Sequence, residues 1–236
     1  MKNKEIIRQM NNEHSKVYDV VLELPFYHQH LNKILNELTP KESGIYLDAG
    51  CGTGNLINKA RCNGYTFIGV DLSDEMLKKA KEKGIENLVK ADITHLPFRN
   101  DYFDGITNVN VLYQLKEPKK FLDEANRVLK TGRKIVISTP DKKASLENFA
   151  PEFIKSLIKN PKIFLRMREI IDYYKINKDI IKENPGFYPK DKLEEMVKES
   201  GFDINKIEKV YAGQNWLVVA KKPREEKEQG LEDKVN

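Results

Sequence analysis

The sequence contains very little cysteine and no long apolar segment. Its two cysteines, Cys51 and Cys62, are too few for a disulfide framework or a cysteine-rich metal cluster. No apolar run approaches the roughly 20 residues that a membrane-spanning helix needs, and no apolar segment follows the charged start of the chain as in a signal peptide. These absences predict a cytoplasmic protein with no membrane partner.

Other groupings that would indicate particular chemistry are also missing. No cluster of aspartate, glutamate and histidine has the spacing of a divalent-metal site, so no metal is expected. No Asn/Asp-Pro-Pro-Tyr/Phe sequence is present, and neither cysteine lies where it could attack a pyrimidine ring. There are no internal repeats.

The composition is that of a folded, highly charged protein. Of the 236 residues, 39% are hydrophobic and 33% are charged, with a net charge of +5. We expect one domain over residues 1–222, because a chain of this length can bury a substantial core. Residues 223–236, which carry mostly acidic and basic side chains, are expected to form a disordered tail.

The most informative motif is a glycine-rich turn between a predicted strand and a predicted helix. The apolar run Ile45–Ala49 predicts a buried strand, and Gly50, Gly52 and Gly54 follow it at alternate positions before a helix that begins at about Asn55. Glycines allow a sharp turn against which a ligand can lie. The exposed N–H groups at the start of the helix favour an anionic group. The motif therefore predicts a site for an anionic cofactor that contains a nucleoside.

The spacing argues against the two commonest phosphate-binding turns. A dinucleotide site needs Gly-x-Gly-x-x-Gly, but the third glycine here is Gly54, one position early, and Asn55 stands where a glycine is required. A P-loop would need Gly-Lys-Ser/Thr, which is absent. Asp48 is also unusual before a nicotinamide turn and would repel a pyrophosphate.

The run Leu-Asp-Ala-Gly-Cys-Gly-Thr-Gly at 47–54 resembles the first motif of the class I S-adenosylmethionine-dependent methyltransferases, in particular their small-molecule, UbiE-like group (methyltransferase type 11). The resemblance implies S-adenosyl-L-methionine as cofactor and S-adenosyl-L-homocysteine as product. It also implies that Asp48 accepts a hydrogen bond from the amino group of the methionine part.

Two further apolar runs, 65–71 and 88–93, are predicted strands that contain carboxylates at their ends. Asp71 is placed to accept both ribose hydroxyls, as an acidic residue does in dinucleotide folds. In the family that the motif resembles, a residue at the place of Asp92 binds the adenine amino group, and the next backbone N–H, here that of Ile93, meets the ring.

Taken alone, these residues leave other roles open. Asp71 could cap the following helix, although Ser73 is better placed to do so, and Asp92 could be an ordinary turn residue. Agreement among the three features favours the cofactor site. The expected cofactor-binding residues are Asp48, Gly50, Cys51, Gly52, Asp71, Leu72, Met76, Asp92, Ile93 and Asn108.

The remaining chain alternates between strand and helix patterns. This predicts an α/β, Rossmann-like, doubly wound sheet of seven strands, mostly parallel, with a C-terminal antiparallel hairpin and added helical segments. The hairpin distinguishes this fold from that of the dehydrogenases. Expected elements are a strand at 103–109, a helix at 119–130 ended by Gly132, a strand at 134–138, a helix at 191–200 ended by Gly201, and hairpin strands at 204–211 and 215–220.

Two segments lie outside the predicted sheet and are expected to determine the acceptor. Residues 1–40 are predicted to form a helical cap, in which the Tyr18-Asp19 pair resembles one that folds over the cofactor in related enzymes; Tyr18 could equally pack in a helical core. Residues 141–189 are predicted to form a helical lid with two blocks broken at Pro161. Its basic residues either cover an acidic or phosphorylated substrate or form a solvated face.

No motif in the sequence singles out a catalytic residue. Candidates near the end of the fourth strand are Asn108, Tyr113 and Gln114, with Tyr18 from the cap. A histidine is common in the family where Gln114 stands, so its absence weakens the case for base catalysis there. His28 and His30 are expected to be surface or structural residues.

Three function classes remain. The leading prediction is methyl transfer to a small-molecule acceptor by in-line displacement. The second is an RNA or protein methyltransferase that uses the basic insertion. Nucleic acid is not the expected partner, but this class stays open. The third is a protein that binds the cofactor without catalysis. The acceptor and the oligomeric state cannot be read from the sequence.

Overall fold

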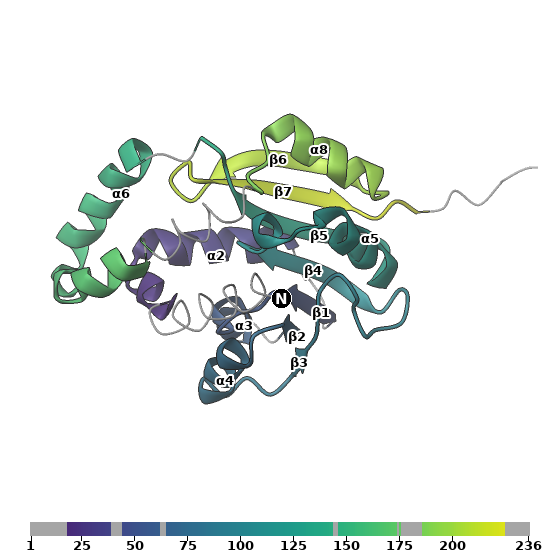
Figure 1. The fold of residues 1–236 in the computed structure, drawn as a ribbon, viewed down its shortest axis with the longest axis horizontal. Coiled ribbons are helices and arrows are strands. Elements are labelled where there is room, and N and C mark those ends of the chain that lie inside the picture. The colour runs from purple at the N-terminus through teal and green to yellow at the C-terminus, as the bar shows by residue number, and fades with distance from the viewer. Residues whose placement is uncertain are drawn as a thin grey trace, which may run out of the picture.

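The structure, a computed structural model, describes residues 18–38, 44–61, 65–143, 146–173, 175 and 186–224 (Figure 1). Outside these ranges lie Cys62, residues 1–17 and 39–40 of the predicted cap, residues 144–145, 174 and 176–185 of the predicted lid, and the tail from 225. Seven strands form one sheet in the order β3-β2-β1-β4-β5-β7-β6. The strands are β1 (Ile45–Ala49), β2 (Thr66–Asp71), β3 (Leu88–Lys90), β4 (Phe103–Val109), β5 (Leu129–Pro140), β6 (Asp203–Val210) and β7 (Asn215–Lys221).

The sheet has the predicted doubly wound topology. Strands β1 to β5 pair in parallel, whereas β7 runs antiparallel to both β5 and β6. From β1 the chain proceeds outward through β2 and β3, then crosses back to β4 on the other side of β1. The C-terminal ends of β1 and β4 therefore flank the point where the winding reverses, which is where ligands bind in open α/β sheets.

Helices cover both faces of the sheet (Figure 1). On one face, α2 (Pro25–Leu38) and α3 (Asn55–Arg61) contribute Leu31, Ile34 and Ile57 to one hydrophobic cluster. On the other face, α5 (Pro118–Val128) and α8 (Lys190–Glu199) contribute Phe121 and Leu193 to a second cluster. The helices contribute to both clusters through apolar residues that recur at helical spacing along one face of each helix.

Shorter elements surround the C-terminal ends of the strands. They are η1 (Tyr18–Glu23), α4 (Asp74–Glu82), η2 (Leu112–Gln114), α6 (Leu146–Lys159) and η3 (Pro161–Arg166). Residues 167–173 continue η3 as a helix. The break at Pro161 is where the sequence predicted it. Helix α6 lies at the far left of Figure 1, away from α5 and α8.

Two predicted helix ends are confirmed by their hydrogen bonds. Ser73 caps α4, since its hydroxyl oxygen accepts from the Met76 N–H at 3.3 Å. Gly201 ends α8 with φ of 79°, and its N–H donates to the Lys198 carbonyl.

The boundary between α5 and β5 differs from the prediction. Helix α5 ends at Val128, and Leu129 is already extended and pairs with Phe103 of β4. Gly132, expected to end the helix, lies inside β5 with φ of 78°, and its N–H donates to the Lys222 carbonyl. Leu129 of β5 is buried in the same cluster as the apolar residues of α5. The apolar pattern of the helix therefore continues into the strand, and the sequence alone does not show where the helix ends.

The third strand is also shorter than predicted. It ends at Lys90, and Asp92 lies in the following turn. The connection 91–102 then returns to β4 without a helix. In the described part of the chain, no helix is both long and apolar enough to cross a membrane.

Candidate functional site

The glycine loop follows β1 and lies between β2 and β4. Gly50, Gly52 and Gly54 have φ of 79°, 54° and 75°, a left-handed region that side chains rarely adopt. A Cβ on Gly50 would lie 2.4 Å from Val111, and one on Gly54 would lie 2.2 Å from Ile85. These two glycines allow close packing within the protein.

Gly52 differs from its two neighbours because its open side faces no protein backbone. A Cβ placed there would find only the Met76 sulfur, at 4.0 Å. Met76 itself is buried on α4. The space beside Gly52 is therefore available to a ligand that lies against the main chain.

Asp71 connects the end of β2 to the glycine loop. One carboxylate oxygen accepts from the Gly52 N–H at 2.8 Å, and the other accepts from the Ser73 N–H at 2.9 Å. Burial raises the pKa of Asp71, and these backbone hydrogen bonds oppose the rise. Each oxygen keeps further acceptor capacity, which suits a pair of ribose hydroxyls. Asp71 is thus not the cap of α4, a role that Ser73 has.

Asp48 is almost fully buried in β1 beside Asp71. Its carboxylate accepts from the Thr107 hydroxyl at 2.9 Å. The pKa of Asp48 is raised to about 7: burial is the main cause, the hydrogen bond from Thr107 opposes it, and the nearby Asp71 carboxylate adds to it. A nearby ammonium group would stabilise the charged form of this carboxyl group and so lower its raised pKa.

Two apolar residues from the predicted set, Leu72 after β2 and Cys51 within the loop, differ in exposure. Leu72, directly after the partly buried Asp71, is 65% exposed. Cys51 is buried, and burial raises the pKa of its thiol, so this cysteine is an inert packing residue.

The predicted adenine residues lie in the turn after β3. Asp92 is exposed, and one of its oxygens accepts from the Thr94 N–H at 2.9 Å and the Thr94 hydroxyl at 2.8 Å. Ile93 is buried in the second hydrophobic cluster. Asp92 therefore stabilises its own turn, as in the alternative role, and within the described part of the chain its second oxygen accepts no hydrogen bond.

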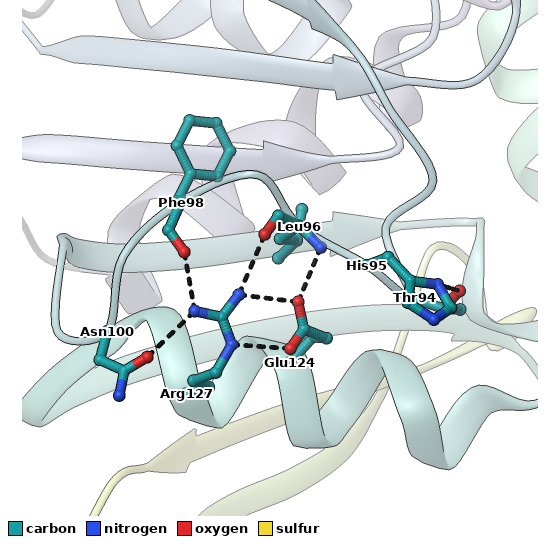
Figure 2. A network of polar contacts seen from close by, with 7 residues as sticks. All are labelled: Thr94, His95, Leu96, Phe98, Asn100, Glu124 and Arg127. Atoms are coloured by element: carbon teal, nitrogen blue, oxygen red, sulfur yellow. Dashed lines mark hydrogen bonds and ion pairs between the residues drawn. The ribbon is translucent and has the colours of Figure 1, made fainter.

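A polar network on α5 holds the connection that follows this turn (Figure 2). The guanidinium of Arg127 donates to the carbonyls of Leu96 and Phe98 at 3.0 and 2.7 Å. Glu124 accepts from the Leu96 N–H at 2.7 Å and pairs with Arg127 at 2.7 Å. The hydrogen bond with Arg127 lowers the pKa of Glu124. This network anchors residues 96–100, and hence the turn that carries Asp92, to helix α5.

Asn108 is completely buried inside the sheet. Its amide donates to the Ala49 carbonyl at 2.9 Å, joining β4 to β1, and its oxygen has no partner in the described structure. Asn108 therefore links β4 to the end of β1, directly before the glycine loop. Gln114 lies on η2, where its amide donates to the Asn110 carbonyl and the Tyr113 hydroxyl, both at 3.1 Å.

Lys83 at the end of α4 joins the N-terminal segment to the glycine loop. Its ammonium donates to Asp19 at 2.8 Å, to the Thr53 hydroxyl at 2.9 Å and to the Asn55 amide oxygen at 2.6 Å. The Thr53 hydroxyl donates to Asp19 at 2.6 Å. Burial lowers the pKa of Lys83, and Asp19 opposes that change. The Tyr18-Asp19 pair is therefore bonded directly to the cofactor loop.

Five tyrosines from five separate elements gather near this end of the sheet. Tyr18 of η1 and Tyr113 of η2 are the two tyrosines that the sequence analysis names as candidate catalytic residues. Tyr27 of α2, Tyr173 of the insertion and Tyr211 of the β6–β7 turn lie with them. Tyr18 and Tyr173 meet edge to face at 6.0 Å, and Tyr27 and Tyr211 at 6.2 Å. Tyr173 contributes to raising the pKa of each of the other four. We call these five residues the tyrosine cluster.

In the tyrosine cluster, which lies close to the glycine loop, Tyr27 and Tyr113 are buried and the other three tyrosines are partly buried. Burial is the main cause that raises the pKa of Tyr18, Tyr27, Tyr113 and Tyr211, and Asp48 adds to the effect on Tyr27. These four hydroxyls stay protonated at neutral pH, so they can donate hydrogen bonds but cannot act as general bases.

The two histidines of α2 have structural partners, as expected. His30 is buried, its Nε2 lies 3.0 Å from the Ser138 hydroxyl, and burial lowers its pKa to about 4. The His30 ring packs on Tyr211 at 5.0 Å. The Nε2 of His28 lies 2.7 Å from the Leu22 carbonyl oxygen.

Sequence reasoning missed Lys83 and the tyrosines of α2, the insertion and the β6–β7 turn. These residues come from segments far apart in the sequence, and none lies in a local motif. Only the folded chain brings them together. Across the described residues, no group of three or more His, Cys, Asp or Glu side chains could hold a metal ion.

Comparisons with known proteins agree with this geometry. A family model described as a methyltransferase domain matches residues 47–137. An uncharacterised protein of Methanocaldococcus jannaschii is 36% identical over 137 residues, which are 58% of this chain and 63% of that protein. A demethylmenaquinone methyltransferase of Staphylococcus aureus is 29% identical over 215 residues, covering 85% of this chain and 86% of that enzyme.

Solved methyltransferase structures share this fold. A solved S-adenosylmethionine-dependent methyltransferase of Thermotoga maritima superposes with a TM-score of 0.64 at 20% identity, over 92% of this chain and 99% of that one. With the sheet topology, these matches support a class I S-adenosylmethionine-dependent methyltransferase: the methyltransferase-domain model covers residues 47–137, and the solved structure shows the same fold over most of the chain. Its cofactor is accordingly S-adenosylmethionine, and the open side of Gly52 beside Asp71 fits that group.

We expect Asp71→Ala to weaken S-adenosylhomocysteine binding by about 2–4 kcal/mol, because two charge-assisted hydrogen bonds to the ribose would be lost. Isothermal titration calorimetry on the folded variant measures the change. Asp74→Ala is the matched control, since Asp74 is an exposed carboxylate on α4 that pairs with Lys90. Unchanged affinity in a folded Asp71→Ala protein would remove Asp71 from the site.

Gly52→Val is expected to abolish cofactor binding while the fold survives. The added side chain would occupy the open space beside the loop, and its positive φ costs about 1–2 kcal/mol. Gly84→Val is the control, because Gly84 has φ of 74° and lies outside the loop. A rise in melting temperature with S-adenosylhomocysteine in the Gly52 variant would show that the loop is misassigned.

Lys83→Met should lower the free energy of unfolding by about 1–3 kcal/mol, because the partly buried Asp19 carboxylate loses its cation. Urea denaturation of this variant, of Asp19→Asn and of the double variant gives a coupling energy, expected to exceed about 0.5 kcal/mol. Lys81→Met is the control on the same helix. Additive effects of the two changes would mean that Lys83 does not hold Asp19.

Proposed function

We propose that this protein transfers a methyl group from S-adenosylmethionine to a small-molecule acceptor. The observation that carries the proposal is the tyrosine cluster beside the glycine loop and Asp71. One part of the site suits a nucleoside cofactor, and the other offers aromatic faces and hydroxyl groups to a second molecule. The similarity to a demethylmenaquinone methyltransferase supports a small acceptor.

The residues divide between the two molecules. We assign the ribose hydroxyls to Asp71, the amino group of the methionine part to Asp48, and the adenine end to Asp92 and the Ile93 N–H. Leu72, an exposed apolar side chain directly after Asp71, would cover the nucleoside. The cofactor supplies an activated methyl group on a sulfonium, and the protein aligns the acceptor with it and excludes water.

The tyrosine cluster favours an uncharged or cationic acceptor. The groups that shift the pKa values of Tyr18, Tyr27, Tyr113 and Tyr211 are other tyrosines, Asp48, Asn55 and Gln114, and none is a lysine or arginine. Among the described residues, the cation nearest to this set is Lys83, which is already bonded to Asn55, Thr53 and Asp19. This argues against the hypothesis that the insertion covers an acidic or phosphorylated substrate.

Proton removal is not a task that these tyrosines can perform. Their raised pKa values keep the hydroxyls protonated, and His30 is too weak a base at neutral pH. We therefore propose that the tyrosines bind and orient the acceptor by donating hydrogen bonds. The acceptor atom must attack without losing a proton to them.

A thermal-shift titration tests the cofactor part of the proposal. S-adenosylmethionine and S-adenosylhomocysteine should stabilise the protein, by about 2.7 kcal/mol at a concentration 100 times the dissociation constant. NAD and NADP should not, because Asn55 and Asp48 exclude a pyrophosphate. Stabilisation by NAD alone would overturn the assignment.

Methyl transfer itself is tested with S-adenosylmethionine that carries a radioactive methyl group. We expect label in a small-molecule fraction of a cell extract rather than in RNA or protein. Label in RNA with a steep salt dependence would support the nucleic-acid alternative. Tight cofactor binding with no transfer to any fraction would indicate a protein that binds the cofactor without catalysis.

A further inference from the structure

The outer surface of the insertion has an unusual composition. In residues 150–173 and 175, every exposed side chain is either apolar or basic, and the three acidic residues of this stretch are only partly exposed. Five of the six large hydrophobic residues that are exposed in the described structure lie here, with exposed fractions from 45% to 84%. They are Ile154, Ile158, Phe164, Leu165 and Ile171, and the exposed basic residues are Lys155, Lys159, Lys162, Arg168 and Lys175.

The insertion also has an inner face, so its outer apolar residues are not a misplaced core. Ile163 is fully buried, and Phe153, Leu157 and Ile170 pack against the same hydrophobic cluster as α2. Ile154 and Ile158, four residues apart on α6, point elsewhere and are more than half exposed. A segment that is apolar on both sides has a second surface that needs a partner.

The charges on the outer surface are unbalanced. Glu152 is paired with Lys155 at 2.6 Å, and Glu169 with Arg166 at 2.5 Å; Arg166 also pairs with Glu23 at 3.1 Å. Lys159, Lys162 and Arg168 form no ion pair within the part of the chain that the structure describes. The surface therefore presents unpaired cations among exposed apolar side chains.

We propose that this surface docks onto an anionic lipid membrane. Apolar side chains that insert between headgroups, surrounded by lysines that meet anionic lipids, are what interfacial helical segments use. The segment protrudes from the body of the protein at α6 (Figure 1), which suits a flat surface. A second copy is a poorer partner, because facing insertions would bring like charges together.

The docking surface and the tyrosine cluster share one segment. Tyr173 follows Ile171 by two residues and faces inward, where it packs against the hydrophobic cluster beside α2. If the proposed function holds, an acceptor dissolved in the lipid would meet the protein at the segment that borders its acceptor site. Docking itself does not rest on the proposed function.

This proposal differs from the expectation that the protein has no membrane partner. That expectation came from the lack of a segment able to span a bilayer, and the described structure contains no such helix. A peripheral contact needs only a surface, and a surface composed of residues from α6, η3 and the helix after it cannot be read from hydropathy along the chain.

Sedimentation with lipid vesicles tests the proposal on the full-length protein. We expect binding to vesicles of phosphatidylcholine mixed with phosphatidylglycerol, weakening as salt is raised, and little binding to phosphatidylcholine alone. Phe164→Ser with Leu165→Ser should reduce the partition coefficient about tenfold or more, because two exposed apolar side chains are lost. The melting temperature with and without S-adenosylhomocysteine shows that this variant is folded.

A charge-reversal pair supplies the matched control. Lys159→Glu with Lys162→Glu should abolish binding to the anionic vesicles. Lys78→Glu with Lys81→Glu changes the net charge equally, at the same spacing on exposed positions of α4, and should retain most of the binding. Equal loss in the two variants would mean that net charge alone attracts the protein, and the proposal would be wrong.

Two further results would overturn the proposal. One is a wild-type protein that does not sediment with anionic vesicles. The other is a dimer in light scattering that Phe164→Ser with Leu165→Ser converts to a monomer, which would make this face an interface between copies. Retained cofactor binding and methyl transfer in those cases would leave the proposed function standing.

Discussion

The left-handed turn at Gly50–Gly54 is the constraint on which the site depends. It takes the chain from the buried end of β1 into α3 within five residues, and three positive φ values are needed to do so. Two of the glycines pack against Val111 and Ile85, while the third leaves open space. The same turn thus packs tightly on the protein side and stays open on the ligand side.

Polar contacts from three directions hold that turn. Asp71 binds the Gly52 N–H from β2, Asn108 binds the Ala49 carbonyl from β4, and Lys83 binds Thr53 from the end of α4. Each contact joins the loop to a different part of the fold. Because backbone N–H groups and a buried hydroxyl would otherwise lack partners, the loop has one favourable arrangement.

The same contacts have a second consequence for function. Lys83 also holds Asp19, so the segment that carries Tyr18 is bonded to the loop that faces the cofactor. Tyr173 belongs to the insertion, whose outer surface is apolar and basic. The tyrosine cluster is therefore assembled from η1, α2, η2, the insertion and the β6–β7 turn, while the glycine loop and Asp71 follow strands of the sheet.

What the sequence by itself determined was local: the glycine turn, the acidic residue that ends β2, the cap at Ser73, the hairpin and the break at Pro161. Each follows from the backbone preferences or the periodicity of neighbouring residues. Such signals fail where two elements share one pattern, as when the apolar spacing of α5 continued into β5 and Gly132 was taken for a helix end. Only the tertiary structure placed Lys83, the tyrosine cluster and the exposed surface of the insertion. Those features depend on contacts between residues far apart in the chain, and the type of a residue alone does not say which distant partner it will meet.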